Sequence, residues 1–228
     1  MKIFERIKSS KLGHYFFGEY DGKTIAFGLL SLAISLFFMG LNLFYAIYAW
    51  SLWYAILTGY YLCLILFRGS IIPLGVRARK KHEGDESGLR QAERRIYLLS
   101  GFFIFILFAV MAIAISELII HGKPGETGTI MAIATAAYTF YKTGLAIYNL
   151  AKSRRIGDWV SQSLRNLNFA DALMSMVSLT VTMLATFGDS GDYALTIEAC
   201  TGFGAAVLVL GLSIYTIVEA LKSKEKGD

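Results

Sequence analysis

The chain has 228 residues, of which 55% are hydrophobic and only 17% are charged, well below the ~25% usual in soluble domains. Its mean hydropathy is +0.53, its formal net charge is +5 and its pI is near 9.1. Its two cysteines, Cys63 and Cys200, both fall in apolar stretches, so we expect no disulfide framework. This composition excludes an ordinary water-soluble domain and makes the lipid bilayer the first expected partner.

Residues 1–23 are charged and aromatic. They lack a short apolar core followed by a small-residue cleavage site, so we expect no cleavable signal peptide. Aromatic side chains among basic ones predict that this segment is cytoplasmic or lies on the inner headgroup surface.

Residues 24–67 run without a charged side chain. A spanning helix needs ~20 apolar residues, so this stretch is long enough for two passes. Trp50 and Trp53 lie near its middle, where a tight turn would meet the headgroup layer that tryptophan prefers. We therefore predict helices over 24–50 and 51–67.

Four more apolar stretches follow, at 96–120, 129–150, 168–187 and 198–221. The predicted fold is all-α: a polytopic membrane protein with a six-transmembrane-helix domain over 24–221. Residues 222–228 would form a short tail, and the longest connection would be 68–95. No extramembrane domain is expected.

The basic residues predict the orientation. Segments 1–23, 68–95, 151–167 and 222–228 hold 20 of the 22 Lys and Arg residues. The positive-inside rule then places both termini in the cytoplasm, in a membrane of the bacterial plasma-membrane type. We interpret the basic cluster at 77–81 as this topology signal and expect no nucleic-acid partner.

Polar residues recur at helical spacing in two of the stretches. Steps of three, four and seven place them on one face of each helix, and both faces should turn away from lipid. The first face holds Thr135, Tyr138, Lys142 and Asn149, and the second holds Asn168, Asp171, Ser175, Ser178 and Thr182.

Lys142 and Asp171 are the charged members of these two faces. We expect a depth difference of roughly 7 Å, which a lysine side chain spans by snorkelling, so an ion pair is predicted. Two interpretations stay open. Asp171 is either a proton or cation site gated by Lys142, or half of a neutralised pair that holds two helices together.

Glu117 and Glu198 lie near the opposite ends of their predicted helices. They are expected to rim an outer vestibule, either as surface carboxylates or as an entrance that attracts cations. Small residues around Gly202 indicate close helix packing. The three histidines lie outside the spans, and we find no enzyme signature and expect no cofactor.

The second half resembles the cation diffusion facilitator family. The resemblance lies in Tyr141-Lys142, in Ser153-Arg154-Arg155-Ile156-Gly157, in Ala170-Asp171-Ala172-Leu173, and in the positions of Gly88, Glu93, Glu117, Pro124, Glu198 and Glu219-Ala220-Leu221. It implies a six-helix body with both termini inside. It also implies an intramembrane divalent-metal site on helices two and five.

The positions that would supply the metal ligands are Gly59, Cys63, Met174 and Ser178. None offers the carboxylate or imidazole that a desolvated Zn²⁺ ion requires, so we expect Zn²⁺ binding there to be weak or absent. We also expect no counterpart of the family's cytoplasmic metal-binding domain. A soft Cys63–Met174 site for Cu(I) is an alternative to plain packing.

Two functions follow from these patterns. The first is a small transporter or permease in which Asp171 and Lys142 couple solute movement to protons. The second is a non-transporting subunit that binds a membrane partner, derived from a transporter fold. Whether the chain forms a homodimer is left open.

Overall fold

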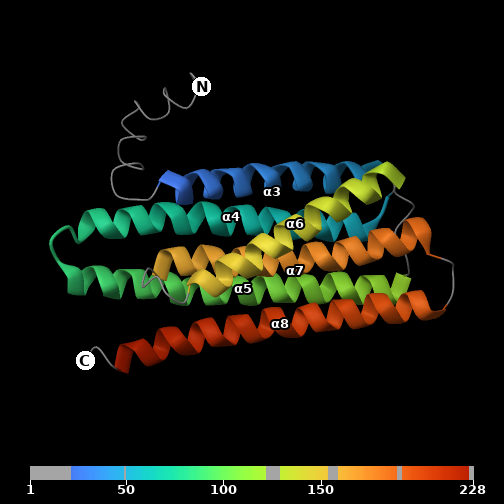
Figure 1. Cartoon of the computed structure of the whole chain (residues 1–228). Helices are drawn as coiled ribbons and strands as arrows, with labels where there is room; N and C mark the ends of the chain where they lie inside the picture. Colours follow the sequence, from blue (N-terminus) through green and yellow to red (C-terminus); the bar gives the residue numbers. More distant parts are fainter. Residues whose placement is uncertain (1–21, 49, 122–128, 154–158, 189–191, 226–228) are drawn as a thin grey trace, which may run out of the picture.

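The structure, a computed structural model, describes residues 22–48, 50–121, 129–153, 159–188 and 192–225. These residues form six α-helices and no strand, which confirms the all-α prediction (Figure 1). The helices are α3 (Gly22–Tyr48), α4 (Leu52–Lys81), α5 (Glu86–His121), α6 (Thr129–Ser153), α7 (Trp159–Phe187) and α8 (Asp192–Glu225). The predicted segment 1–23 lies almost wholly outside the described residues.

Several helices are long and apolar enough to cross a membrane. They are α4, α5, α7 and the Tyr193–Ser223 part of α8, and Leu32–Tyr48 of α3 is a shorter apolar stretch. Large apolar side chains such as Phe37, Phe102 and Phe203 are half or more exposed on the outer surface. Such a surface is unfavourable in water but suits contact with acyl chains, so the architecture is that of a membrane helix bundle.

The helices extend beyond the predicted apolar spans. α4 continues through Pro73 to Lys81, α5 begins at Glu86, and α7 begins at Trp159. The predicted connection 68–95 is therefore mostly helix, and α8 makes most of the predicted tail helical. Hydropathy marks where side chains stop suiting lipid, whereas the backbone hydrogen-bond ladder continues into the polar layer until a cap or breaker ends it.

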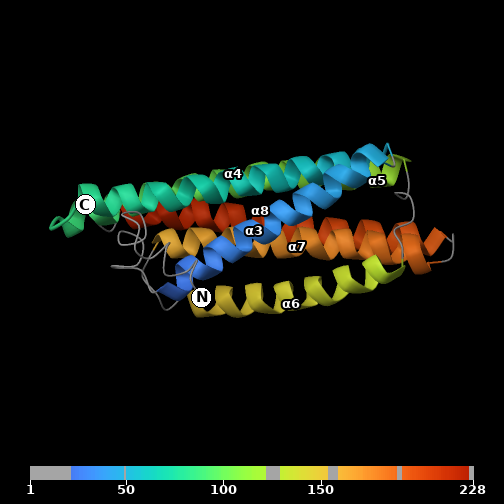
Figure 2. The ribbon, with the colours of Figure 1, turned by 90° about the horizontal axis from the view of Figure 1, so that it is seen from above.

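The helices run antiparallel in sequence order, and α7 is central. α7 packs against α4, α5, α6 and α8, while α3 packs along α4 and α5 packs along α8. α6 lies along α7 on the side away from α5 and α8 (Figure 2). The start of α3 and the end of α8 lie at one end of the bundle, which we call the basal end (Figure 1).

Small residues allow α5 and α8 to approach closely. A Cβ atom on Gly101 would lie 2.6 Å from Ile217 Cγ1, and one on Gly202 would lie 3.0 Å from Ile115 Cγ1. Ser213 Oγ on α8 also donates to the Gly101 carbonyl at 2.9 Å. The packing role predicted for Gly202 agrees with this geometry.

Candidate functional site

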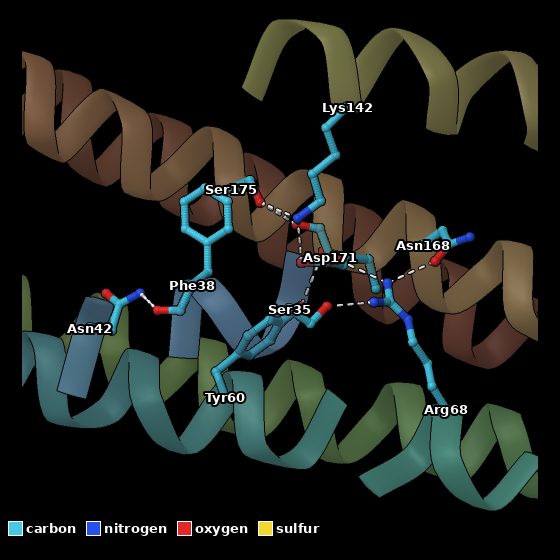
Figure 3. A network of polar contacts seen from close by, with 10 residues as sticks. Ser35, Phe38, Asn42, Tyr60, Arg68, Lys142, Asn168, Asp171 and Ser175 are labelled. Carbon is cyan, nitrogen blue, oxygen red and sulfur yellow. Dashed lines mark hydrogen bonds and ion pairs between the residues drawn. The ribbon is translucent and has the colours of Figure 1, made fainter. Parts of the chain in front are cut away.

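Three charged side chains from three helices meet inside the bundle. Asp171 on α7 is only 1% exposed, and its two oxygens are held by different cations (Figure 3). Lys142 Nζ on α6 lies 2.7 Å from Oδ1, and Arg68 on α4 places a guanidinium nitrogen 2.9 Å from Oδ2. We call Arg68, Lys142 and Asp171 the ion triad. The predicted Lys142–Asp171 pair is present.

The third member, Arg68, was missed by the sequence analysis, which assigned it to the connection after the second helix. In the structure Arg68 lies 13 residues before the end of α4, and its side chain is 3% exposed. A signal did exist in the sequence. Arg68 follows the apolar run directly. If the helix continues for three more turns, Arg68 lies within the helix and not at its end, so its side chain can face the inside of the bundle.

Lys142 and Asp171 lie at nearly the same depth. Lys142 is 11 residues before the end of α6, and Asp171 is 12 residues after the start of α7. At 1.5 Å per residue both lie roughly 17–18 Å from the basal ends of their helices. The predicted offset of roughly 7 Å is therefore wrong, because α7 begins well before the apolar stretch from which depth was counted.

Arg68 connects three helices through its planar guanidinium group. One terminal nitrogen donates to Ser35 Oγ on α3 at 2.6 Å. The other donates to Asn168 Oδ1 at 2.7 Å as well as to Asp171. This forked geometry is specific to arginine, and it ties α3 and α7 to α4 at the level of the triad.

Lys142 is held by oxygen acceptors and also lies near two aromatic rings. Its ammonium group donates to Ser175 Oγ at 2.7 Å, and that hydroxyl donates to the Asp171 backbone carbonyl at 2.8 Å. The ring centroids of Tyr61 and Tyr138 lie 5.9 and 5.8 Å from Nζ, within cation–π range. The predicted residues Tyr138, Asn168 and Ser175 thus all belong to the site.

Phe38 on α3 completes an aromatic wall beside the lysine. Its ring stacks on Tyr61 and on Tyr138, with centroid separations of 6.0 and 4.9 Å. The stacking joins α3, α4 and α6 beside Lys142. We call Phe38, Tyr61 and Tyr138 the aromatic wall.

The positions expected for a degenerate metal site do not form a ligand cluster. Met174 is fully buried in the hydrophobic core, and Cys63 packs against that core. Ser178 is half-buried, and a Cβ on Gly59 would meet nothing within 4 Å. Within the described residues there is no group of three or more His, Cys, Asp or Glu that could hold a metal ion.

The two carboxylates expected at an outer vestibule differ from each other. Glu117 Oε2 lies 2.8 Å from His121 Nδ1, one turn further along α5. Glu198 is 1% exposed and so does not face water as a rim residue would. α8 begins at Asp192 rather than Glu198, which places Glu198 in the second turn, where the helix is already packed.

A second set of polar contacts lies toward the basal end. Tyr97 on α5 donates to Glu219 Oε2 on α8 at 2.7 Å, and Asn166 on α7 donates to Thr216 Oγ1 at 3.0 Å. These hydrogen bonds join α5, α7 and α8 without contacting the triad. The sequence analysis noted Glu219 only through the family resemblance.

Comparisons of the chain with protein-family models, with curated proteins and with solved structures found no match. The resemblance to cation diffusion facilitators therefore depends on the quoted residues alone.

Proposed function

We propose that this membrane protein is a small secondary transporter whose central site is the ion triad. One observation carries the proposal: Asp171 lies deep within the bundle, and its two oxygens are bonded to cations from two other helices. Ionisable groups are costly at such depth, and where they occur they mark solute pathways and proton relays.

The geometry supports coupling to protons. A proton on Asp171 Oδ1 removes the carboxylate acceptor of Lys142 Nζ, and the ionic contact between α6 and α7 is lost, which leaves only the neutral acceptor Ser175 Oγ. α6 lies along α7 on the outside of the bundle, so its release would open the site while α4, α5 and α8 stay packed (Figure 2). Exchange between paired and protonated states would then drive alternating access.

The proposal includes an orientation. Segments 1–23, 68–95, 151–167 and 222–228 adjoin the basal ends of the helices along the chain, and apart from Arg68 they hold 19 of the 22 Lys and Arg residues. The positive-inside rule favours a cytoplasmic basal end, in a bacterial-type plasma membrane.

Flux in proteoliposomes tests the proposal. The wild type should move protons together with a solute from a panel of metal ions, small organic cations and small organic anions. Asp171→Asn and Lys142→Met should abolish coupled flux, while Lys81→Met, at an exposed lysine, should not. Flux that is absent, or unchanged in both triad variants, would overturn the proposal.

A second candidate function is a non-transporting subunit, and the closure of the triad favours it. Both Asp171 oxygens are bonded within the chain, and such a closed cluster can join helices without binding any solute. Affinity purification from native membranes separates the two. A stoichiometric membrane partner together with absent flux favours the subunit, whereas flux from the chain alone favours the transporter.

A further inference from the structure

We infer that the ligand of the ion triad is a monovalent organic anion: a carboxylate on a small apolar body. This names the substrate class of the proposed transporter and rests on that function, although binding can be measured without flux. The sequence pattern alone left a cation at Asp171 open, but Arg68 adds a second positive charge beside that carboxylate.

The first argument is charge. The triad has two cations and one carboxylate, so it carries one surplus positive charge. Charge removed from water is unfavourable unless it is compensated. A monovalent anion makes the site neutral, whereas a bound cation would double the surplus. A dianionic phosphoryl group would reverse the charge and would also lose more hydration.

The second argument is a hydrogen-bond donor. A lysine ammonium group has three N–H bonds. Within the described residues, the Lys142 ammonium group donates to two oxygen acceptors, Asp171 Oδ1 and Ser175 Oγ. This leaves its third N–H for a ligand. The Lys142 side chain is 15% exposed, compared with 3% for Arg68, so Lys142 is the accessible cation of the triad.

The third argument is the aromatic wall. Tyr61 and Tyr138 flank the ammonium group, and Phe38 stacks on both rings. Flat apolar groups pack favourably against such rings. A carboxylate that accepts from Lys142 would thus place its apolar body against this wall, which a fully hydrated inorganic anion does not match.

The test uses three probes that share one body and differ in charge: benzoate, benzamide and benzylammonium. The full chain is purified in detergent, and binding is followed by calorimetry and by the thermal unfolding midpoint. Benzoate should bind and raise the midpoint, while benzamide and benzylammonium should not. Tighter binding of benzylammonium than of benzoate, or no benzoate binding by the wild type, would overturn the inference.

Variants that change the charge of the triad should change the affinity for benzoate in opposite directions. Lys142→Met makes the triad neutral and leaves Arg68 paired with Asp171, so it should fold and should bind benzoate at least about tenfold more weakly. Arg68→Gln should also weaken benzoate binding, and Asp171→Asn should strengthen it. A cation site predicts the opposite sign for Asp171→Asn. Lys81→Met is the matched control and should bind as the wild type does.

Flux and binding together separate the two proposals. Benzoate binding that depends on Lys142, with no flux of any solute, sustains the anion site and overturns the transporter. Cation flux that depends on Asp171, with no benzoate binding, sustains the transporter and overturns the anion site.

Discussion

Arg68 and Lys142 hold opposite oxygens of one carboxylate, at 2.9 and 2.7 Å. Because these cations come from α4 and α6, the single residue Asp171 ties two helices to α7. Neither cation substitutes for the other: Arg68 is enclosed by polar side chains, whereas Lys142 adjoins the aromatic wall. This difference separates a structural role from a ligand-binding one, and it can be measured.

Removal of the shared carboxylate should destabilise the bundle strongly. Asp171→Asn leaves the buried Arg68 and the partly buried Lys142 without their counter-charge, and a broken buried pair costs about 3–5 kcal/mol. The midpoint of thermal unfolding in detergent should fall accordingly. Ser178→Ala, two turns along the same helix, is the control and should change stability by about 0.5 kcal/mol or less. Equal midpoints for the two variants would show that the triad does not stabilise the fold.

The shape of the guanidinium group should matter as much as its charge. Arg68→Lys keeps the cation, but a single ammonium group cannot reproduce the fork that reaches Ser35, Asn168 and Asp171. We expect a loss of about 1–3 kcal/mol in unfolding free energy. In a double-mutant cycle, Ser35→Ala should cost less in the Arg68→Lys background than in the wild type. Additive effects would contradict the shared geometry.

The close contact of α5 and α8 predicts intolerance of a methyl group. Gly101→Ala places Cβ 2.6 Å from Ile217 Cγ1, so the Ile217 side chain or the helices must shift, and we expect a loss of about 1–3 kcal/mol. Gly211→Ala on α8 meets nothing within 4 Å and should be neutral or stabilising by up to about 1 kcal/mol. Unfolding of the two variants in mild detergent measures this difference in stability. Equal stabilities would refute the close α5–α8 contact as the cause.

The local stability of the first turn of α5 should depend on pH. Hydrogen bonds from the Gly88 backbone N–H and the Ser87 hydroxyl lower the pKa of Asp85 below its usual value. The folded-state pKa is lowered, so the cap contributes fully above the unfolded pKa of about 3.9 and is lost as pH falls through the folded value. As the pH falls through this range, amide exchange in residues 86–89, corrected for intrinsic rates, should accelerate.

Asp85→Asn is the matched variant for that measurement. Asparagine also caps a helix N-terminus but does not titrate in this range. Exchange in its first turn of α5 should therefore be nearly independent of pH. A wild type without acceleration, or a variant with the same acceleration, would remove Asp85 as the cause.

The orientation can be tested by cysteine labelling. In a chain whose two free cysteines are replaced by alanine, Ser87→Cys tests the basal end and Tyr193→Cys the opposite end. A membrane-impermeant maleimide applied to intact cells should label position 193 and should reach position 87 only after lysis. The reverse pattern would invert the topology and refute the positive-inside assignment.

The sequence by itself determined the class of the protein and one of its central contacts. Long uncharged stretches predicted membrane helices, because lipid accepts neither charged side chains nor unpaired backbone groups. The three- and four-residue spacing on α6 and α7 predicted that Lys142 and Asp171 face each other, because helical periodicity places such residues on one face.

Only the tertiary structure decided that Arg68 is the third member of the triad and that Glu198 is buried. Hydropathy treats the first charged residue after an apolar run as the end of a span, although the helix continues as long as its backbone hydrogen bonds do. The neighbours of a charge past that boundary depend on how the helices pack, and the spacing within one helix carries no information about that. The net positive charge of the ion triad follows from this packing.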